Sequence, residues 1–194
     1  MSNIKTKILV EGAAMVALAT VLSFIPIVKL PWGGSITLLS MLPIVLFSIR
    51  RGVKAGLAAS VTYSLLQLFQ GIVMDGLLGW GLTPGLLAGC IFLDYIGAFT
   101  ILGLAGLLRK KKLSGWISGI TLVIVLRFLF HVLSGVVIFH SAGMLWEGFS
   151  TDNSVLYSIL YNGCYMLPEL IFTLAGAIAL LKAPQTSRLL LKEE

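Results

Sequence analysis

Four ionisable side chains stand inside segments of the sequence that are otherwise apolar. They are Asp94, Arg127, His131 and Glu169. A charged group in apolar surroundings is costly unless it meets a partner, a ligand or water, so such residues usually mark a site. A carboxylate and an imidazole can hold a polar heterocycle or a cation, or they can pass a proton. We therefore expect the chemistry of this chain where these side chains meet.

The composition indicates that these residues are surrounded by lipid. Hydrophobic types make up 58% of the 194 residues and charged types only 11%, with a mean hydropathy of +1.01. Soluble proteins carry about 25% charged residues, and a helix needs about 20 apolar residues to cross a bilayer. We therefore predict an all-α membrane protein with one domain, residues 1–194, whose six transmembrane helices span 8–28, 36–49, 55–70, 84–108, 114–139 and 154–181.

The basic residues predict how this bundle is oriented. If six spans alternate, every one of the 14 Lys and Arg residues except Lys29 and Arg127 falls on the side of the N-terminus. Because basic residues gather on the cytoplasmic side of membrane proteins, both termini are predicted to be cytoplasmic. This asymmetry accounts for the net charge of +6 and gives no reason to expect a nucleic-acid partner.

Three polar residues are predicted to share one depth in the outer half of the bundle. Asp94 is ten residues from the outer start of its helix, which is about 15 Å at 1.5 Å per residue. His131 and Asn162 are each eight residues from the outer ends of theirs, or about 12 Å. A carboxylate, an imidazole and an amide are thus expected around one space.

Spacing on the fifth predicted helix adds residues at this level. Arg127, His131, Gly135 and Phe139 follow one another at intervals of four and form one stripe. Gly135 leaves room for a ligand or for a neighbouring helix. Aromatic residues are expected near the outer mouth, namely Trp32 after the first helix, and Tyr157 and Tyr161 at the start of the last. Together these groups suit a small, flat, polar heterocycle, including a cationic one.

Each of these residues also has a structural interpretation. Asp94 and Arg127 could form an ion pair, and His131 could be a packed core histidine. The aromatic residues at the mouth could belong to the interfacial belt of a membrane protein, and Asn162 could join two helices. Glu169 lies deeper than the others, and for it a structural role is the favoured interpretation.

Motifs for metal binding and for catalysis are missing from the sequence. Cys90 and Cys164 form no CxxC pair and have no histidine at metal spacing, so no metal site is predicted. No GxxxxGK[ST] phosphate loop and no HExxH motif occur, so the chain is not expected to hydrolyse ATP by itself. We predict no catalytic residue and no cofactor.

Several motifs together resemble a known family. They are Pro31-Trp32-Gly33-Gly34-Ser35-Ile36-Thr37, Leu93-Asp94-Tyr95, Arg127-Phe128-x-x-His131-x-x-Ser134-Gly135, and Tyr157 with Tyr161-Asn162. This combination, spread over nearly the whole chain, is similar to the thiamine-specific substrate-binding component of bacterial energy-coupling factor (ECF) transporters. The resemblance implies a thiamine-binding subunit in the bacterial cell membrane that captures its ligand from outside.

The resemblance also implies a set of thiamine-binding residues. Transferred to this sequence, they are Trp32, Asp94, Tyr95, Arg127, His131, Gly135, Phe139, Tyr157 and Asn162. Three of them depart from the family pattern, in which we expect Glu in place of Asp94, Lys in place of Arg127 and Trp in place of Phe139. The shorter reach of Asp94 and the smaller ring of Phe139 are expected to affect hydrogen bonding and stacking.

Partners are implied in the same way. The family docks on a transmembrane coupling protein that two cytoplasmic ATPases drive, and docking uses small residues on the first helix. Here Ala13 and Ala17 stand four residues apart, and small residues let another helix approach closely. The alternative is that they pack within the bundle.

Two other functions remain open from the residues. A proton-coupled carrier that works alone could use Asp94, His131 and Glu169 as a relay. An intramembrane enzyme acting on a lipid could use Asp94 or His131 as an acid or base, although acidic pairs with metal spacing are missing.

Overall fold

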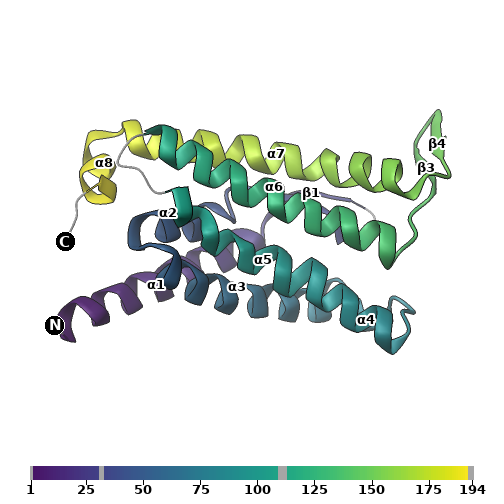
Figure 1. Ribbon diagram of the computed structural model, residues 1–194, viewed down its shortest axis with the longest axis horizontal. Coiled ribbons are helices and arrows are strands. Elements are labelled where there is room, and N and C mark those ends of the chain that lie inside the picture. The colour runs from purple at the N-terminus through teal and green to yellow at the C-terminus, as the bar shows by residue number, and fades with distance from the viewer. Residues whose placement is uncertain (1, 31–32, 109–112, 192–194) are drawn as a thin grey trace.

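Long helices, packed roughly side by side, form an elongated bundle in the computed structural model, which describes residues 2–30, 33–108 and 113–191. Within these residues, five helical segments are long and apolar enough to cross a membrane. They are α1 (Ser2–Ser23), α3 (Val53–Met74), the composite helix Pro84–Leu108, α6 (Leu113–Val137) and α7 (Ser154–Lys182). A short helix, α8 (Pro184–Leu191), follows α7, and both ends of the chain lie at one end of the bundle (Figure 1).

The composite helix changes its geometry three times. It consists of α4 (Pro84–Cys90), the π-helical segment η3 (Ile91–Gly97), α5 (Ala98–Thr100) and the 3₁₀-helical segment η4 (Ile101–Leu108). A π-helical turn is wider than an α-helical one and often occurs at functional sites. Asp94 lies in this wide segment.

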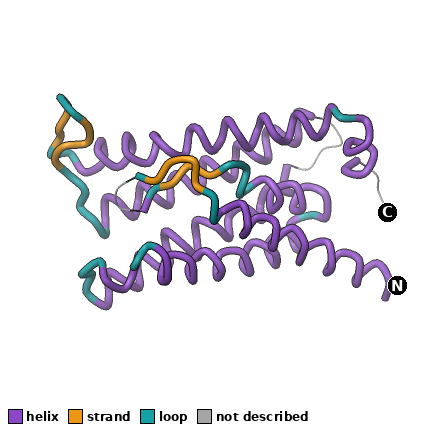
Figure 2. Tube along the Cα trace, turned by 180° about the vertical axis from the view of Figure 1, so that it is seen from behind, coloured by secondary structure: helices purple, strands orange, loops and turns teal. Residues whose placement is uncertain are grey.

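The segment between α1 and α3 differs from the prediction. The helices expected over 8–28 and 36–49 are replaced in part by an antiparallel hairpin, β1 (Pro26–Lys29) and β2 (Ser35–Thr37), and by α2 (Leu42–Arg51). Pro26 has no N–H for a helix to use, and Gly33 at φ +90° and Leu39 at φ +66° turn the chain. Hairpin and α2 together bring the chain back to the end where it began (Figures 1 and 2).

The expected second transmembrane helix is not found among the described residues, because α2 has only 10 residues, too few to span a bilayer by itself. Eight of these residues, Leu42 to Ile49, are buried, so α2 is an interior helix. A second hairpin, β3 (Gly143–Trp146) and β4 (Phe149–Thr151), joins α6 to α7, and the 3₁₀ turn η2 (Leu77–Gly79) follows α3. The fold is therefore mostly helical rather than all-α.

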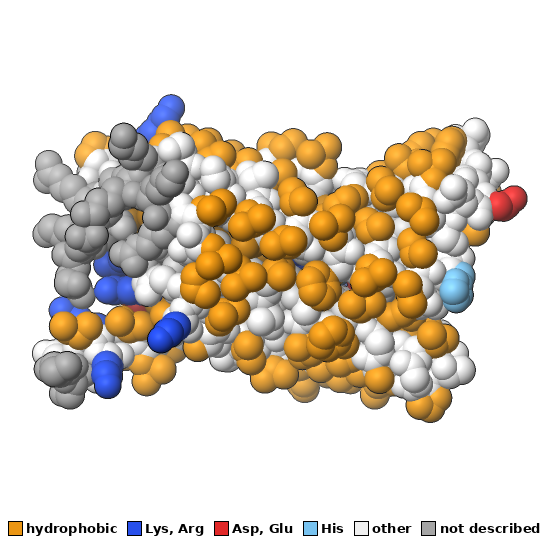
Figure 3. Space-filling model, viewed as in Figure 1, with side chains coloured by type: hydrophobic (Ala, Val, Ile, Leu, Met, Phe, Trp, Pro, Cys, Tyr) orange, Lys and Arg blue, Asp and Glu red, His pale blue; other side chains and the backbone are white. Residues whose placement is uncertain are grey.

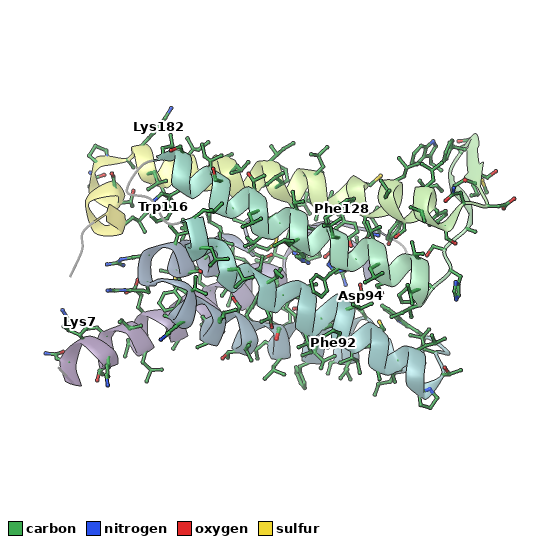
Figure 4. All side chains as sticks on the ribbon, in the orientation of Figure 1. Lys7, Phe92, Asp94, Trp116, Phe128 and Lys182 are labelled. Atoms are coloured by element: carbon green, nitrogen blue, oxygen red, sulfur yellow. The ribbon has the colours of Figure 1, made fainter. Side chains whose placement is uncertain are left out.

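The surface divides into an apolar middle and polar ends. Hydrophobic side chains cover the middle of the face in Figure 3, and Lys and Arg side chains gather at the end that holds the termini. Lys7 and Lys182 lie at that end in Figure 4. There Glu11 of α1 pairs with Arg50 at 2.7 Å and with Arg51 at 2.5 Å, which joins α1 to α2. The basic run 109–112, between the predicted helices 84–108 and 114–139, lies outside the described residues.

Candidate functional site

Asp94 is held by side chains from two helices. Its Oδ1 lies 2.8 Å from Nδ1 of His131, and its Oδ2 accepts hydrogen bonds from the hydroxyl of Ser134 and, at 3.4 Å, from the thiol of Cys90. Figure 4 shows Asp94 between η3 and α6, whereas Phe92 lies on the outer side of the same helix. The wide turn of η3 thus directs one carboxylate into the bundle at a defined position.

Arg127 does not pair with this carboxylate. One of its Nη atoms lies 2.6 Å from the sulfur of Met41, and its guanidinium carbon lies 4.1 Å from the ring centre of Phe99, a cation–π contact. Within the described residues the one basic side chain that contacts Asp94 is the imidazole of His131. The expected alternative of an Asp94–Arg127 pair is therefore wrong, and the charge of Arg127 faces an aromatic ring.

Gly135 sets the distance between α6 and α7. A Cβ atom at this position would overlap the hydroxyl of Ser158, and that hydroxyl donates to the carbonyl of Val132 at 3.0 Å. The sequence left open whether a ligand or a neighbouring helix fills the space beside Gly135. In the structure, the neighbouring helix α7 fills it. Close packing here brings Asn162 of α7 to the level of His131, and both side chains are buried.

Asn162 belongs to a polar and aromatic face of α7. Its amide nitrogen donates to the carbonyl of Ser158 at 2.8 Å, and its oxygen accepts from the hydroxyl of Tyr165 at 2.5 Å. The ring of Tyr165 meets His131 edge to face, with 6.0 Å between ring centres. Nearer the start of α7, the rings of Tyr157 and Tyr161 stack on each other with 18° between their planes. The N-terminal half of α7 therefore presents three phenol rings and an amide to one space.

These side chains line a single cavity of about 430 Å³. That volume lies in the range of pockets that bind small molecules, about 300–1,000 Å³. All of the expected site residues that the structure describes contribute to its wall, and Trp32 lies outside the described residues. The contributors are Asp94, Tyr95, Arg127, His131, Gly135, Phe139, Tyr157 and Asn162.

The wall on the side of α1 and α3 was not foreseen. Ser23 of α1 donates to Gln70 at 2.9 Å and accepts from Gln67 at 2.9 Å, so one hydroxyl and two amides form a neutral polar patch. The cavity also touches Trp80, whose indole N–H donates to the carbonyl of Asp75 at 2.9 Å. In the sequence, this patch is indicated only by two glutamines three residues apart in an apolar helix. Glutamine carries no charge, so these residues do not stand out as the ionisable ones do.

Aromatic rings lie at the mouth beside Phe139. The rings of Trp80 and Phe139 are 6.0 Å apart between centres and inclined by 59°. Tyr95 reaches α3, where an added Cβ at Gly71 would overlap its phenol. An indole therefore lies next to Phe139, the position at which the family pattern is expected to have tryptophan, and it belongs to the segment after α3.

Glu169 reaches the same cavity from deeper in α7. Its Oε1 accepts from the main-chain N–H of Thr37 at 2.5 Å and from the hydroxyl of Thr37 at 2.6 Å. These bonds join β2 to α7, in line with the structural role favoured from the sequence. Within the described part of the chain, three buried polar atoms of cavity residues lack a hydrogen-bond partner: Nε of Arg127, Nε2 of His131 and Oε2 of Glu169.

Comparisons with known proteins agree with this architecture. Residues 9–188 match the model of the family described as thiamine transporter protein (Thia_YuaJ). The thiamine transporter ThiT of Bacillus subtilis is 32% identical over 96% of this chain and 94% of its own length. A solved structure of ThiT from Listeria monocytogenes superposes with a TM-score of 0.70 at 27% identity, over 94% of this chain and 97% of that one.

The match begins within α1, at residue 9, and extends over the other spans, both hairpins and every described residue of the cavity wall. The apolar helices are those of a protein that crosses the bacterial plasma membrane several times. The chain therefore belongs to the thiamine transporter protein family.

Proposed function

We propose that this chain binds thiamine in the 430 Å³ cavity and acts as the substrate-binding subunit of an ECF-type importer. One observation carries the proposal: eight residues chosen from the sequence line one cavity, seven of them on three separate helical segments and Phe139 just after α6. The relatives are thiamine transporters by name, which supports thiamine as the ligand. The chain itself performs no chemistry on the ligand in this proposal.

In the proposed complex, aromatic rings hold the two flat rings of thiamine. Phe139, Tyr95 and Tyr157 offer faces that attract the positive charge of the thiazolium. Asp94 and His131 take the polar or cationic parts of the ligand. Arg127 and Asn162 hold the hydroxyethyl end or keep Asp94 in place. The unpartnered nitrogens of His131 and Arg127 give hydrogen-bonding capacity for this role after small side-chain adjustments.

The proposed orientation has both termini in the cytoplasm. Supporting it, Lys and Arg side chains gather at the end that holds the termini, and basic residues favour the cytoplasmic side. The passage formed by the first hairpin and α2 completes an even number of crossings. Thiamine then enters from the opposite end, and an ATPase-driven coupling protein reorients the subunit so that the ligand leaves inside.

The proposed docking surface for the coupling protein lies on α1. Ala13 and Ala17 are both exposed there, so they are free to receive another helix. Their small side chains permit the close approach that helix packing in lipid requires. Packing within the bundle, the alternative considered above, does not use these two side chains.

Mass spectrometry of the purified protein tests the ligand. The chain is extracted in mild detergent, washed and denatured, and the released small molecules are identified. We expect thiamine in the wild-type sample and much less of it in a sample of the Asp94→Ala variant prepared in parallel. Release of a different compound, with no binding of added thiamine in the absence of ATP, would refute the proposal.

The Asp94–His131 contact at 2.8 Å favours one second candidate, a carrier driven by protons. Against it, Glu169 bonds to Thr37 in the described structure and is not hydrogen-bonded to this pair. Proteoliposomes containing this chain alone decide between the two. A pH gradient that drives thiamine uptake would favour the carrier, and binding without uptake favours the subunit.

A further inference from the structure

The hairpin β3–β4 exposes large apolar side chains beyond the ends of the helices. Met144 is 72% exposed and Trp146 is 46% exposed. Both occupy the exposed positions of β3, whose residues alternate between half-buried and exposed, although the pairing of β3 with β4 is irregular between them. The ring of Trp146 stacks on Phe149, with 4.9 Å between ring centres and 22° between ring planes. The hairpin thus carries an ordered aromatic pair next to an exposed methionine.

The position of the hairpin brings this face to the edge of the membrane-spanning surface. Figures 1 and 2 show it at the end of the bundle opposite the termini, where it projects to the side of α7. The neighbouring turns of the spans are also apolar and exposed: Val137 of α6 at 51%, and Val155 and Ile159 of α7 at 50% and 42%. The apolar face of the hairpin therefore continues the surface that meets lipid.

The charge pattern agrees with contact to lipid. Between Ser141 and Ser150 the only charged residue of the sequence is Glu147, which stands at the turn of the hairpin. Tryptophan is enriched where membrane meets water because its ring is apolar and its N–H is polar. Exposed to water, Met144 and Trp146 would lose the free energy that burial of apolar area provides.

We propose that the hairpin β3–β4 is an anchor at the membrane surface. Met144 and Trp146 insert among the lipid headgroups of the leaflet opposite the termini, and Glu147 stays in water. The lining residues His140, Ser141 and Ala142 lead directly into β3. After β4, Asn153 caps α7 by accepting the N–H groups of Val155 and Leu156, both at 3.0 Å. The anchor thus holds one rim of the cavity at the level of the membrane surface.

Tryptophan fluorescence in vesicles tests the anchor. Wild-type protein and the Trp146→Phe variant are reconstituted in phosphatidylcholine vesicles, and the difference between their spectra gives the emission of Trp146. We expect blue-shifted emission that is mostly lost when the lipids are brominated near their carbonyl ends. Bromines near the methyl ends should quench it less, because an interfacial ring lies far from the bilayer centre.

The Trp80→Phe variant is the matched control, since Trp80 lies in the other connection at the same end and turns its indole N–H to Asp75. Its difference spectrum should change little with either brominated lipid. Two results would overturn the anchor. Quenching of Trp146 by aqueous acrylamide without an effect of bromine would place the ring in water, and resistance to both quenchers would mean that protein, such as a second copy of the chain, covers it.

Discussion

Thr37 and Glu169 are joined by two hydrogen bonds to a single carboxylate oxygen, one from the main chain of Thr37 and one from its side chain. The hydroxyl of Thr37 also lies 2.6 Å from that of Ser40. This contact fixes the first hairpin against the middle of α7, directly after Pro168, which lies inside this helix. It is the polar link between the hairpin and the floor of the cavity.

Replacing Thr37 by Val should destabilise the protein by about 1–2 kcal/mol, because a buried carboxylate oxygen loses one of its two donors. Thermal unfolding in detergent measures the change. Thr62→Val is the matched control, since the hydroxyl of Thr62 bonds to a carbonyl of its own helix on the exposed surface. Equal melting temperatures for the two variants would mean that the link to Glu169 adds nothing to stability.

Replacing Asp94 or His131 by Ala should weaken thiamine binding by about 2 kcal/mol or more, roughly 30-fold. Either change removes a polar group of the cavity and the hydrogen bond that this group makes with its partner. Titration calorimetry gives the affinity, and Asp152→Ala, an exposed carboxylate outside the cavity, should bind like the wild type. Unchanged affinity in both cavity variants would rule out this site.

Gly135→Ala should cost about 1–3 kcal/mol of stability, because the added methyl group overlaps the hydroxyl of Ser158. Adding Ser158→Ala should recover part of the loss, since it removes the overlapping oxygen. Gly163→Ala serves as the control, because an added Cβ there meets no atom within 4 Å. Melting temperatures compare the three, and a lack of recovery in the double variant would speak against this account of the helix spacing.

Phe139→Leu should lower thiamine affinity by about 1 kcal/mol, close to fivefold, since the ring offers a face to the ligand beside Trp80. The quenching of tryptophan fluorescence by thiamine measures the affinity. The same substitution at Phe69, which is 63% exposed on α3, should leave the affinity unchanged. If both variants bind equally well, Phe139 does not stack on the ligand.

Ala13→Leu together with Ala17→Leu should prevent the chain from joining a coupling complex while thiamine binding persists. Larger side chains on the exposed face of α1 keep a partner helix at a distance. Co-purification of an ATPase module from a bacterial host is the measurement. Ala58→Leu, at an exposed alanine of α3, is the control, and a complex that forms equally well with all three chains would move the docking surface elsewhere.

The polar residues of the cavity can be predicted from the sequence because ionisable groups are rare and costly in segments that lie in lipid. Asp94 and His131 stand out in apolar runs, and the rise of a helix is enough to place them at one depth. The hydrogen-bond partner of Asp94 could not be predicted. A π-helical turn directs Asp94 toward His131, and the pattern of apolar residues in Ile91–Gly97 does not reveal such a turn. Gln67 and Gln70 carry no charge and so lack the contrast that identifies the others.

The first connection shows a different limit of sequence analysis. Residues 36–49 form an apolar run that is equally compatible with a helix and with a strand followed by a shorter helix. In the structure, the strand is held by a contact of Thr37 with Glu169, far away in the sequence. Tertiary hydrogen bonds of this kind override the local preference and cannot be read from a window of neighbouring residues.

The short α2 has a consequence for the origin of the binding space. A full helix in its position would fill the interior of the bundle with side chains along its whole length. Here the part of this segment before α2 is a hairpin that contributes Gly33, Gly34 and Ser35 to the cavity wall, and these residues occupy little volume. The cavity therefore exists because a short helix and a hairpin of small residues take the place of one full-length helix.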